Sequence, residues 1–346
     1  MQRNTVVVLL VLGFGVVSLL ADASYEGLRS YLPVGVSESL SLGGLLGVGE
    51  LLAWGLRPLS GVLAEASGRY WEAVLAGYFM VPLGVALASR GGGLYIAAGY
   101  WVERLGKAVR GPARDHLLSA IAPRARRGLV FGVHEALDQV GGILGPLLAY
   151  MLLSRRMPLV LLAIPGAAGF LVSLVLSVRY WGLSGASGRP GSLKRAVLSV
   201  RLSGRALLFT LIVGLLTPNP LVVEHVAGLE GVEEEILPLI YMVSMLADAI
   251  AAVPLGMVYD WSERASIGLV AGLGAPAAIL LLSSHGFGAR LLAAAALAGV
   301  VESSYETIAR AMARGAAAYG ALGVSRGVAA AGSMILYSSL YNICPL

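Results

Sequence analysis

Ionisable side chains stand inside long apolar segments of this chain, where a charge is costly to bury. Asp22 and Glu26 are four residues apart in the first such segment, and Glu50 is alone in the second. His134 and Asp138 are also four residues apart, so each pair shares one face of a helix. Charges in apolar spans usually mark a path for an ion or solute, or a buried ion pair. A carboxylate that loses its hydration binds a proton more readily, so we predict that Asp138 takes and releases protons beside His134.

Four charged residues form a further stripe that is mostly basic. Its members, which follow one another at helical spacing, are Glu103, Lys107, Arg110 and Arg114. The stripe can attract an anionic solute, or it can neutralise nearby carboxylates. In the second case Asp138 would be the permanent partner of an arginine, and we keep both interpretations open.

A third group, near the end of the sequence, is acidic. It contains Glu302, Tyr305 and Glu306. Carboxylate oxygens and imidazole nitrogens are also metal ligands. The sequence therefore allows a further alternative, in which a divalent metal ion is held by Asp22, Glu26, His134 and Asp138. This alternative requires that the four side chains converge.

The composition indicates that apolar helices position these groups. Hydrophobic residues make up 57% of the chain and charged residues 13%, against about 25% in soluble proteins. The mean hydropathy is +0.80, and the 346 residues accommodate about eleven spans of roughly 20 residues each. We therefore predict an all-α integral membrane protein, in which 46 glycines let helices pack closely.

A short loop signature occurs twice and indicates an internal repeat. The same frame of glycine, acid and arginine runs from Gly61 to Arg69 and again from Gly256 to Arg264. Both copies stand between apolar segments, in different halves of the sequence. Such duplication is typical of membrane proteins built from two related bundles.

The spans and the loops between them define the expected organisation. The spans are 5–31, 40–60, 71–89, 93–115, 127–153, 157–180, 206–226, 236–257, 265–284, 288–310 and 316–341. We predict a six-helix bundle over 1–182, a cytoplasmic linker over 183–205 and a C-terminal bundle of about five helices over 206–346, one helix short of the first. Basic loops stay in the cytoplasm. We therefore expect the N-terminus and both repeated loops inside and the C-terminus outside.

These motifs resemble those of the major facilitator superfamily (MFS) of secondary transporters, over the whole chain. The residues that match its loop between helices two and three are Gly61, Glu65, Gly68 and Arg69 in the first copy and Gly256, Asp260 and Arg264 in the second. The residues Gly141, Gly145 and Pro146 resemble a fifth-helix motif that is frequent in exporters. The stretches 103–115 and 127–138 are similar to a poorly characterised prokaryotic branch of the superfamily.

The resemblance implies an MFS fold of two pseudo-symmetric helical bundles and the activity of a secondary active transporter. Such a protein moves a small solute across the cytoplasmic membrane by alternating access. We expect proton coupling here, and the fifth-helix motif favours export. The loop signature would act as a gate whose contacts break as the two halves move. The alternatives are a divalent metal ion transporter of the same fold and, from another class, a non-transporting receptor or assembly partner.

Other classes of function are disfavoured. The sequence has no nucleophile elbow, phosphate-binding glycine loop or zinc signature, so we expect neither an enzyme nor a cofactor. The basic residues cluster in loops, as membrane topology requires, and this argues against nucleic-acid binding. Cys344 is the only cysteine and cannot form an internal disulfide. We expect a monomer whose partners are the lipid bilayer, a small solute and protons.

Overall fold

The computed structural model of the chain is built of helices. It describes residues 3–36, 39–121, 127–182, 204–308, 312 and 316–343, and within these ranges no strand occurs. The prediction of an all-α protein is confirmed. A helix satisfies its own backbone hydrogen bonds, which a segment in lipid requires because no water is available there.

The helices occupy the predicted spans. Their bounds are α1 (Arg3–Gly35), α2 (Ser39–Glu50), α3 (Arg57–Ser67), α4 (Tyr70–Ala88), α5 (Gly93–Ile121), α6 (Arg127–Ser154), α7 (Ala163–Tyr180), α10 (Gly204–Leu216), α11 (Pro220–Leu229), α12 (Leu237–Trp261), α13 (Glu263–Leu282), α14 (Ala289–Glu306) and α16 (Ala316–Ile343). A π-helical turn, η1 (Leu51–Gly55), links α2 to α3, and a 3-10 turn, η3 (Leu159–Leu162), precedes α7.

Within the described residues, seven helical segments are long and apolar enough to cross a membrane. They are Val8–Gly35, Tyr70–Ala88, Ala136–Ser154, Leu159–Tyr180, Gly204–Leu229, Leu237–Trp261 and Glu263–Leu282. The long helix α5 is not among them, because the charged stripe interrupts its apolar sequence. The number and length of these segments indicate a multi-pass membrane protein.

The helices group into two compact units. Unit 1 contains Met1–Leu28, Leu56–Leu148 and Met157–Ser199, and unit 2 contains Arg29–Gly55, Ala149–Arg156 and Val200–Leu346. This grouping differs from the predicted bundles because α2 packs against α16 and is counted with the later helices. The boundaries predicted along the sequence, at 182 and 206, remain a prediction.

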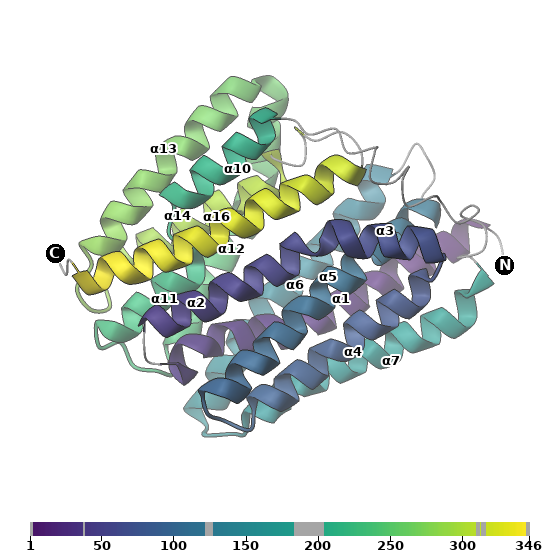
Figure 1. Cartoon of the computed structure of the whole chain (residues 1–346), viewed down its shortest axis with the longest axis horizontal. Coiled ribbons are helices and arrows are strands. Elements are labelled where there is room, and N and C mark those ends of the chain that lie inside the picture. The colour runs from purple at the N-terminus through teal and green to yellow at the C-terminus, as the bar shows by residue number, and fades with distance from the viewer. Residues whose placement is uncertain are drawn as a thin grey trace. The chain divides into compact units, whose positions relative to one another are not determined.

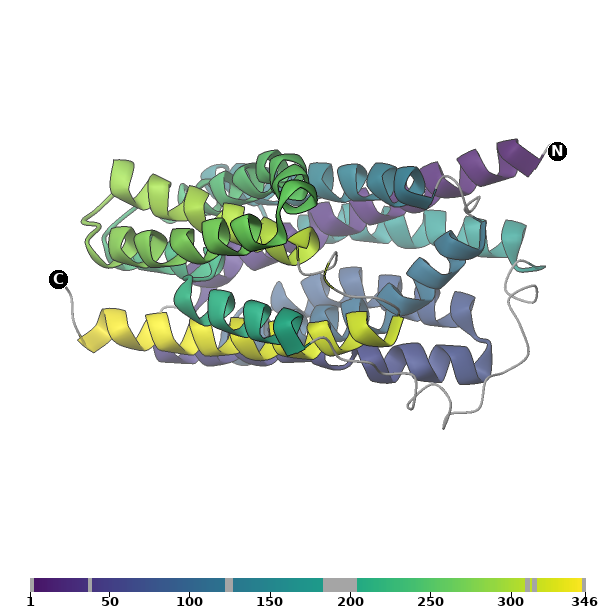
Figure 2. The ribbon, with the colours of Figure 1, turned by 90° about the horizontal axis from the view of Figure 1, so that it is seen from above.

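Small residues let α2 and α16 lie against each other within unit 2 (Figure 1). A Cβ atom built on Gly47 of α2 would stand 3.3 Å from the Cα atom of Ala331. One built on Gly43 would stand 3.0 Å from the carbonyl oxygen of Met334. The helix α10 runs along α16 as well (Figure 2). Close approach of backbones through small residues is a common way for helices to associate in lipid.

Glycines also set the contact between α4 and α5 in unit 1. A Cβ atom on Gly99 would stand 2.3 Å from the carbonyl oxygen of Gly84 and 2.6 Å from the backbone nitrogen of Ala88. One on Gly77 would stand 2.6 Å from the carbonyl oxygen of Gly106. Rotation of side chains cannot relieve contacts with backbone atoms. These glycines therefore hold α5, with its charged stripe, directly against α4.

We expect Gly99→Ala to destabilise the protein. The added methyl group would overlap backbone atoms of α4, and overpacking of this kind costs about 1–3 kcal/mol. The measurement is the melting temperature of the purified variant in detergent. Gly142→Ala is the matched control, because no atom lies within 4 Å of a Cβ built at that helical position. Equal losses in the two variants would contradict the prediction.

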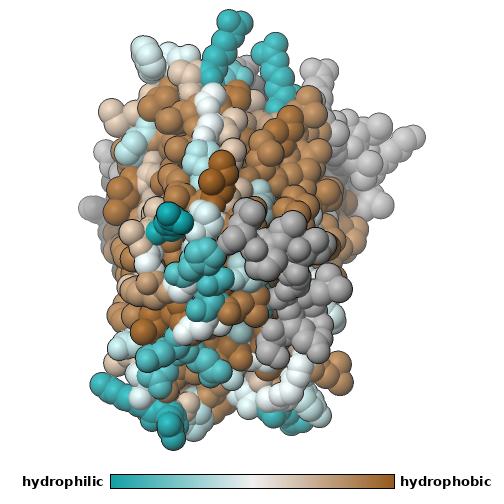
Figure 3. Space-filling view, turned by 90° about the vertical axis from the view of Figure 1, so that its left-hand side faces the viewer, coloured by the Kyte–Doolittle hydropathy of each residue, from teal (hydrophilic) through white to brown (hydrophobic). Residues whose placement is uncertain are grey.

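The outer surface of the helices is apolar. Trp261, Val178 and Ile250 are 82%, 76% and 73% exposed. On the face drawn in Figure 3, hydrophobic side chains cover wide areas, while hydrophilic ones gather near the top and bottom and in a band between them. Such a surface suits helices that are surrounded by lipid rather than water.

Glu230, at the end of α11, forms hydrogen bonds with α16 and with the loop between α13 and α14. Its carboxylate accepts a hydrogen bond from the Tyr341 hydroxyl of α16 and another, at 3.0 Å, from the backbone N–H of Gly286. Nδ1 of His285 lies 3.9 Å from the same carboxylate. The Tyr341 hydrogen bond lowers the pKa of Glu230 from its ordinary value of 4.5, and Gly286 and His285 lower it further, while partial burial opposes them.

We expect Glu230 to stabilise the fold only while it is ionised. A group whose folded-state pKa is depressed adds stability above its unfolded-state pKa, and loses it as the pH falls through the folded-state value. The melting temperature should therefore drop more between about pH 5 and pH 3 in the parent than in Glu230→Gln. The exposed Glu235 provides the control Glu235→Gln, which should follow the parent. An equally steep drop in Glu230→Gln would refute the role of this carboxylate.

Candidate functional site

Unit 1 gathers the predicted basic stripe around one aromatic ring of α1. Lys107 donates a hydrogen bond to the Tyr25 hydroxyl at 3.1 Å, and its Nζ lies 4.8 Å from the ring centre. The Cζ atoms of Arg104 and Arg110 lie 4.9 Å and 5.4 Å from the same centre. Cations over an aromatic face are attracted by the ring quadrupole. The basic stripe of α5 therefore lies against α1.

Glu103 is the counter-ion within this stripe. Its side chain is fully buried, and its Oε2 accepts a hydrogen bond from Nε of Arg104 at 2.6 Å. Its Oε1 lies 3.5 Å from Nη2 of Arg110. Arg104 is fully buried too. Charges buried to this degree require partners of opposite sign, so Glu103 serves the structure of unit 1.

Asp138 of α6 also meets an arginine. Its Oδ2 lies 3.8 Å from Nη1 of Arg114 and 3.8 Å from Nδ1 of His134. Arg114 is shared with Asp115, whose carboxylate lies 3.0 Å from Nη2. This geometry matches the interpretation of Asp138 as the partner of an arginine. Its other oxygen, Oδ1, is buried with no hydrogen-bond partner among the described residues. The proton-carrying role of Asp138 stays a prediction.

Ser18 of α1 contacts side chains of three other helices, α4, α5 and α6. Its hydroxyl lies 3.1 Å from Nε2 of His134 and 3.2 Å from the Tyr78 hydroxyl of α4. It also accepts a hydrogen bond from Nη1 of Arg114 at 3.0 Å. Sequence analysis missed Ser18 and Tyr78, because a hydroxyl in an apolar helix often bonds only its own backbone. The Ser18 hydroxyl helps to orient His134, and the Tyr78 hydroxyl in turn contacts Ser18.

Asp22 differs from the other acids of unit 1. It is 9% exposed, and no hydrogen bond or ion pair joins its carboxylate to another residue in the described ranges. The charges of Lys107 and Arg110 attract it, while those of Asp138 and Glu26 repel it. Glu26 is 5% exposed on the same helix face. Asp22 is thus an acid of unit 1 that its surroundings do not hold in a direct ion pair.

The fifth-helix motif brings α6 onto α1. A Cβ atom on Gly141 would stand 2.4 Å from the carbonyl oxygen of Leu19, and one on Gly145 would stand 2.6 Å from the backbone nitrogen of Gly27. Pro146 lies inside α6, which continues beyond it. These glycines serve the close packing of α6 and α1.

The metal alternative is not supported. Among the described residues, no three His, Cys, Asp or Glu side chains form a group that could hold a metal ion. The four side chains that the sequence suggested, Asp22, Glu26, His134 and Asp138, are all described. His134 is instead within hydrogen-bonding distance of Ser18 and faces Asp138.

The repeated loop signature lies at the ends of helices. Gly68 ends α3 with φ 68°, a left-handed conformation that glycine adopts without strain, and its N–H bonds the carbonyl oxygen of Ala64. Gly61 packs on Pro112 of α5, and α12 runs through Gly256. The acid and the arginine of each copy are exposed, namely Glu65 and Arg69 in the first and Asp260 and Arg264 in the second. No ion pair joins these four to another residue in the part of the chain described, so the gate stays a prediction.

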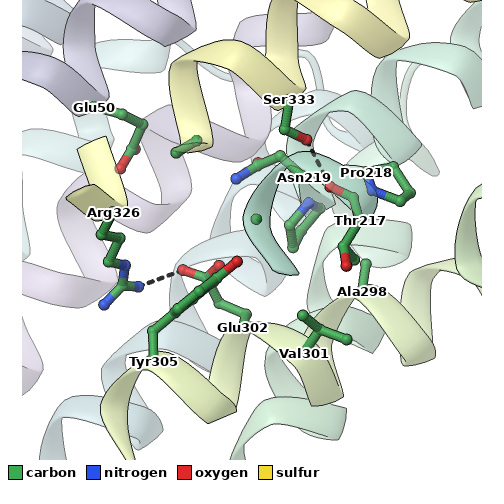
Figure 4. Close-up of a pocket in the computed structure, with 13 residues that line it drawn as sticks. Glu50, Thr217, Pro218, Asn219, Ala298, Val301, Glu302, Tyr305, Arg326 and Ser333 are labelled. Carbon is green, nitrogen blue, oxygen red and sulfur yellow. Dashed lines mark hydrogen bonds and ion pairs between the residues drawn. The ribbon is translucent and has the colours of Figure 1, made fainter. Parts of the chain in front are cut away.

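Unit 2 holds a pocket at the junction of α10 and α11, which α2, α14 and α16 complete (Figure 4). Its volume, including the open mouth, is about 380 Å³. The lining residues are Glu50, Gly214, Thr217, Pro218, Asn219, Pro220, Ala298, Val301, Glu302, Tyr305, Arg326, Ala330 and Ser333. In Figure 4, Glu50 and Arg326 stand on one side, and Ala298 and Val301 on the other.

Arg326 of α16 is held on several sides. Its Nη2 donates a hydrogen bond to Oε1 of Glu302 at 2.5 Å. Its Cζ lies 3.9 Å from the ring centre of Trp54 and 5.1 Å from that of Tyr305. A guanidinium between aromatic rings and a carboxylate is both neutralised and fixed in direction.

Glu50 has a similar set of partners. Its Oε1 accepts a hydrogen bond from Nη2 of Arg29 at 3.0 Å, and its Oε2 accepts one from Nε1 of Trp54 at 2.9 Å. Arg29 in turn lies over the ring of Tyr241, with its Cζ 5.8 Å from the ring centre. The pocket therefore has two ion pairs, one through each of its acids.

Glu224 of α11 stands apart from these pairs. It is fully buried, and neither of its carboxylate oxygens has a hydrogen-bond partner among the described residues. The cation whose charge acts on it is Arg29. Buried polar groups are nearly always hydrogen-bonded, so this carboxylate requires an explanation.

The structure brings three of the predicted residues of unit 2 together. Glu50, Glu302 and Tyr305 line the pocket, while the side chain of Glu306 lies outside the described residues. The predicted site omitted Arg326, which is the basic residue of the pocket lining.

A break in the seventh span creates part of this pocket. The Asn219 side chain accepts a hydrogen bond from the backbone N–H of Leu221, at 3.0 Å, and so caps α11, with Pro220 in its first turn. The sequence Pro218-Asn219-Pro220 was the signal that could have located the site, because discontinuous spans often mark the binding site of a transporter.

Comparison with known proteins agrees with the fold. A sequence model of the family described as Major Facilitator Superfamily matches residues 14–335. The chain belongs to this superfamily. It is 33% identical, over 362 aligned residues, to uncharacterised proteins of Mycobacterium bovis and Mycobacterium tuberculosis, with 95% of this chain and 86% of each relative covered. The predicted resemblance to a poorly characterised branch is confirmed.

Solved structures of transporters share the MFS fold. A POT family transporter in complex with 5-aminolevulinic acid gives a TM-score of 0.69 at 12% identity, covering 96% of this chain and 90% of that one. A bacterial homologue of the human lysosomal transporter Spinster, in an inward-facing and unoccupied conformation, gives 0.64 at 15% identity, covering 96% and 81%. This MFS protein is accordingly a multi-pass membrane protein of a family of secondary transporters, whose substrates are small molecules.

Proposed function

We propose that this MFS protein moves a small polar solute across the cytoplasmic membrane by alternating access, with proton coupling. The observation that carries the proposal is the Glu224 carboxylate, fully buried and without a hydrogen-bond partner among the described residues. An ionised carboxylate in that setting is strongly disfavoured until something neutralises it. A proton neutralises it completely.

Arg29 connects Glu224 with the pocket. Its Nη2 lies 3.0 Å from Oε1 of Glu50, which lines the pocket, and its charge also acts on Glu224. Ionised Glu224 competes with Glu50 for this cation, and protonated Glu224 does not. The proton and the solute therefore act on the same arginine, and this shared partner couples them.

Unit 1 supplies two further candidates for proton binding. Asp22 comes first, because no ion pair holds it to a residue in the described ranges. Asp138, the residue predicted from the sequence, comes second, because its contact with Arg114 at 3.8 Å must break before a proton can replace it.

The direction and orientation that we propose follow from the sequence. The basic loops support an N-terminus in the cytoplasm and a C-terminus outside. The fifth-helix motif, with Gly141, Gly145 and Pro146, is the feature that supports export. It acts through the packing of α6 on α1.

Flux through liposomes tests the proposal. The purified full-length chain is reconstituted, and labelled amino acids, sugars, organic acids, organic cations and divalent metal ions are offered with and without a proton gradient. We expect one organic class to accumulate only with the gradient, and to be released when a protonophore collapses it. Movement that ignores the protonophore would refute proton coupling. Accumulation of a metal ion alone would restore the metal alternative, and absence of any flux would refute transport.

A further inference from the structure

We infer that the pocket of unit 2 binds a small zwitterion, a solute that carries an ammonium and a carboxylate group in the manner of an amino acid. This inference rests on the proposed function, because it names the solute that the transporter moves. Its basis is the chemistry of the pocket lining, which combines side chains of both charges with polar groups and small apolar residues.

The charged side of the pocket offers both halves of an ion pair. Nη2 of Arg326 lies 2.5 Å from Oε1 of Glu302. Glu50 lines the same side of the pocket (Figure 4). A zwitterion can exchange partners with this pair, with its carboxylate on Arg326 and its ammonium on Glu302 or Glu50. The exchange buries no additional net charge, and charge-assisted hydrogen bonds replace those that are lost.

A solute with a single charge fits the same lining less well. An anion on Arg326 would leave Glu302 without its cation, and a cation on Glu302 would leave Arg326 without its carboxylate. This pair is partly buried, and leaving one member of it unmatched is unfavourable. Glu302 is balanced by Arg326, and Glu50 by Arg29 outside the lining, so a ligand that brings both charges preserves this balance.

The position of Arg326 makes this exchange possible. Its guanidinium lies 3.9 Å from the ring centre of Trp54 and 5.1 Å from that of Tyr305. These rings continue to stabilise the cation when Glu302 turns to a ligand. The Arg326 guanidinium is thus preorganised to bind a carboxylate, because its planar group can donate two parallel hydrogen bonds to one.

The other side of the pocket limits the size of the solute. Ala298, Val301 and Pro218 supply its apolar surface, and Asn219 and Thr217 supply polar groups beside them. No large aliphatic or unpaired aromatic surface is available there for a bulky amphipathic compound. The lining therefore favours a small polar solute over a bulky apolar one.

Binding of matched ligands to the purified full-length chain tests the inference. Calorimetry in detergent would compare a panel of L-amino acids with their amides, which keep the ammonium alone, and with their N-acetyl derivatives, which keep the carboxylate alone. We expect at least one amino acid to bind, and both of its derivatives to bind about tenfold more weakly or worse. Arg326→Gln should lose binding, and Arg326→Lys should recover part of it. The exposed Arg290, outside the pocket, provides the control Arg290→Gln.

Each outcome separates this inference from the proposed function. An amide that binds as tightly as the parent amino acid would overturn the zwitterion and indicate a cation site, and an equally tight N-acetyl derivative would indicate an anion site. Absence of amino-acid binding, while another class crosses liposomes, would overturn the inference alone. Selective amino-acid binding without proton-dependent flux would uphold it and overturn coupled transport. If Arg326→Gln fails to fold, binding by Arg326→Lys and the comparison of amino acids with their derivatives still test the inference.

Discussion

Glu224→Gln should strongly reduce proton-driven accumulation of the solute while exchange of solute for solute continues. The glutamine side chain has nearly the shape of the carboxyl group, but it cannot gain or lose a proton. Arg29 then no longer responds to the proton gradient, and its contact with Glu50 persists in all states. We expect accumulation to fall by about 5–150-fold, the range that typical coupling free energies produce.

The comparison of two assays in liposomes measures this effect. Uptake driven by a proton gradient should be strongly reduced in Glu224→Gln, whereas counterflow, with solute on both sides and no gradient, should stay near the parent rate. Glu233→Gln is the matched control, because Glu233 lies shortly after α11 and is exposed. Unchanged gradient-driven uptake in Glu224→Gln would move the proton-binding role to Asp22 or Asp138. Loss of both activities would point to a structural defect instead.

The helices and the superfamily could be predicted from the sequence, because hydropathy and the spacing of residues can be read within single segments. The spacing of Glu103, Arg110 and Arg114 places them on one face of α5, and Arg110 and Arg114 of that stripe contact side chains of α1. The partner of Asp138 could not be assigned in this way. It depends on the rotation of α6 against its neighbours, which Gly141 sets by its contact with α1.

The pocket of unit 2 was less accessible to such reasoning. Arg326 stands in the last apolar span, and no local pattern indicates that it reaches Glu302 of the preceding span. Glu224 stands nine residues before a run of exposed acids that begins at Glu233, so the sequence suggests a helix end exposed to water. The fold buries it completely. Long-range packing, rather than spacing, decides both cases.

Glu103→Gln should be among the most destabilising conservative changes in unit 1. The substitution leaves Arg104, which is fully buried, and Arg110, which is 3% exposed, without the carboxylate that neutralises them. Removal of one partner from a buried ion pair typically costs about 3–5 kcal/mol. We expect a large drop in the melting temperature of the purified variant, or failure to accumulate in the membrane.

A second substitution distinguishes loss of charge balance from loss of packing. In Glu103→Gln combined with Arg104→Met, one unmatched cation is gone, so the double variant should recover a measurable part of the lost stability although it carries more changes. Glu72→Gln on the exposed side of α4 should match the parent. If Glu103 instead served the solute, Glu103→Gln would be as stable as the parent but inactive in flux. The two roles of the α5 stripe, structural pairing and attraction of an anion, thus predict opposite results in the same pair of assays.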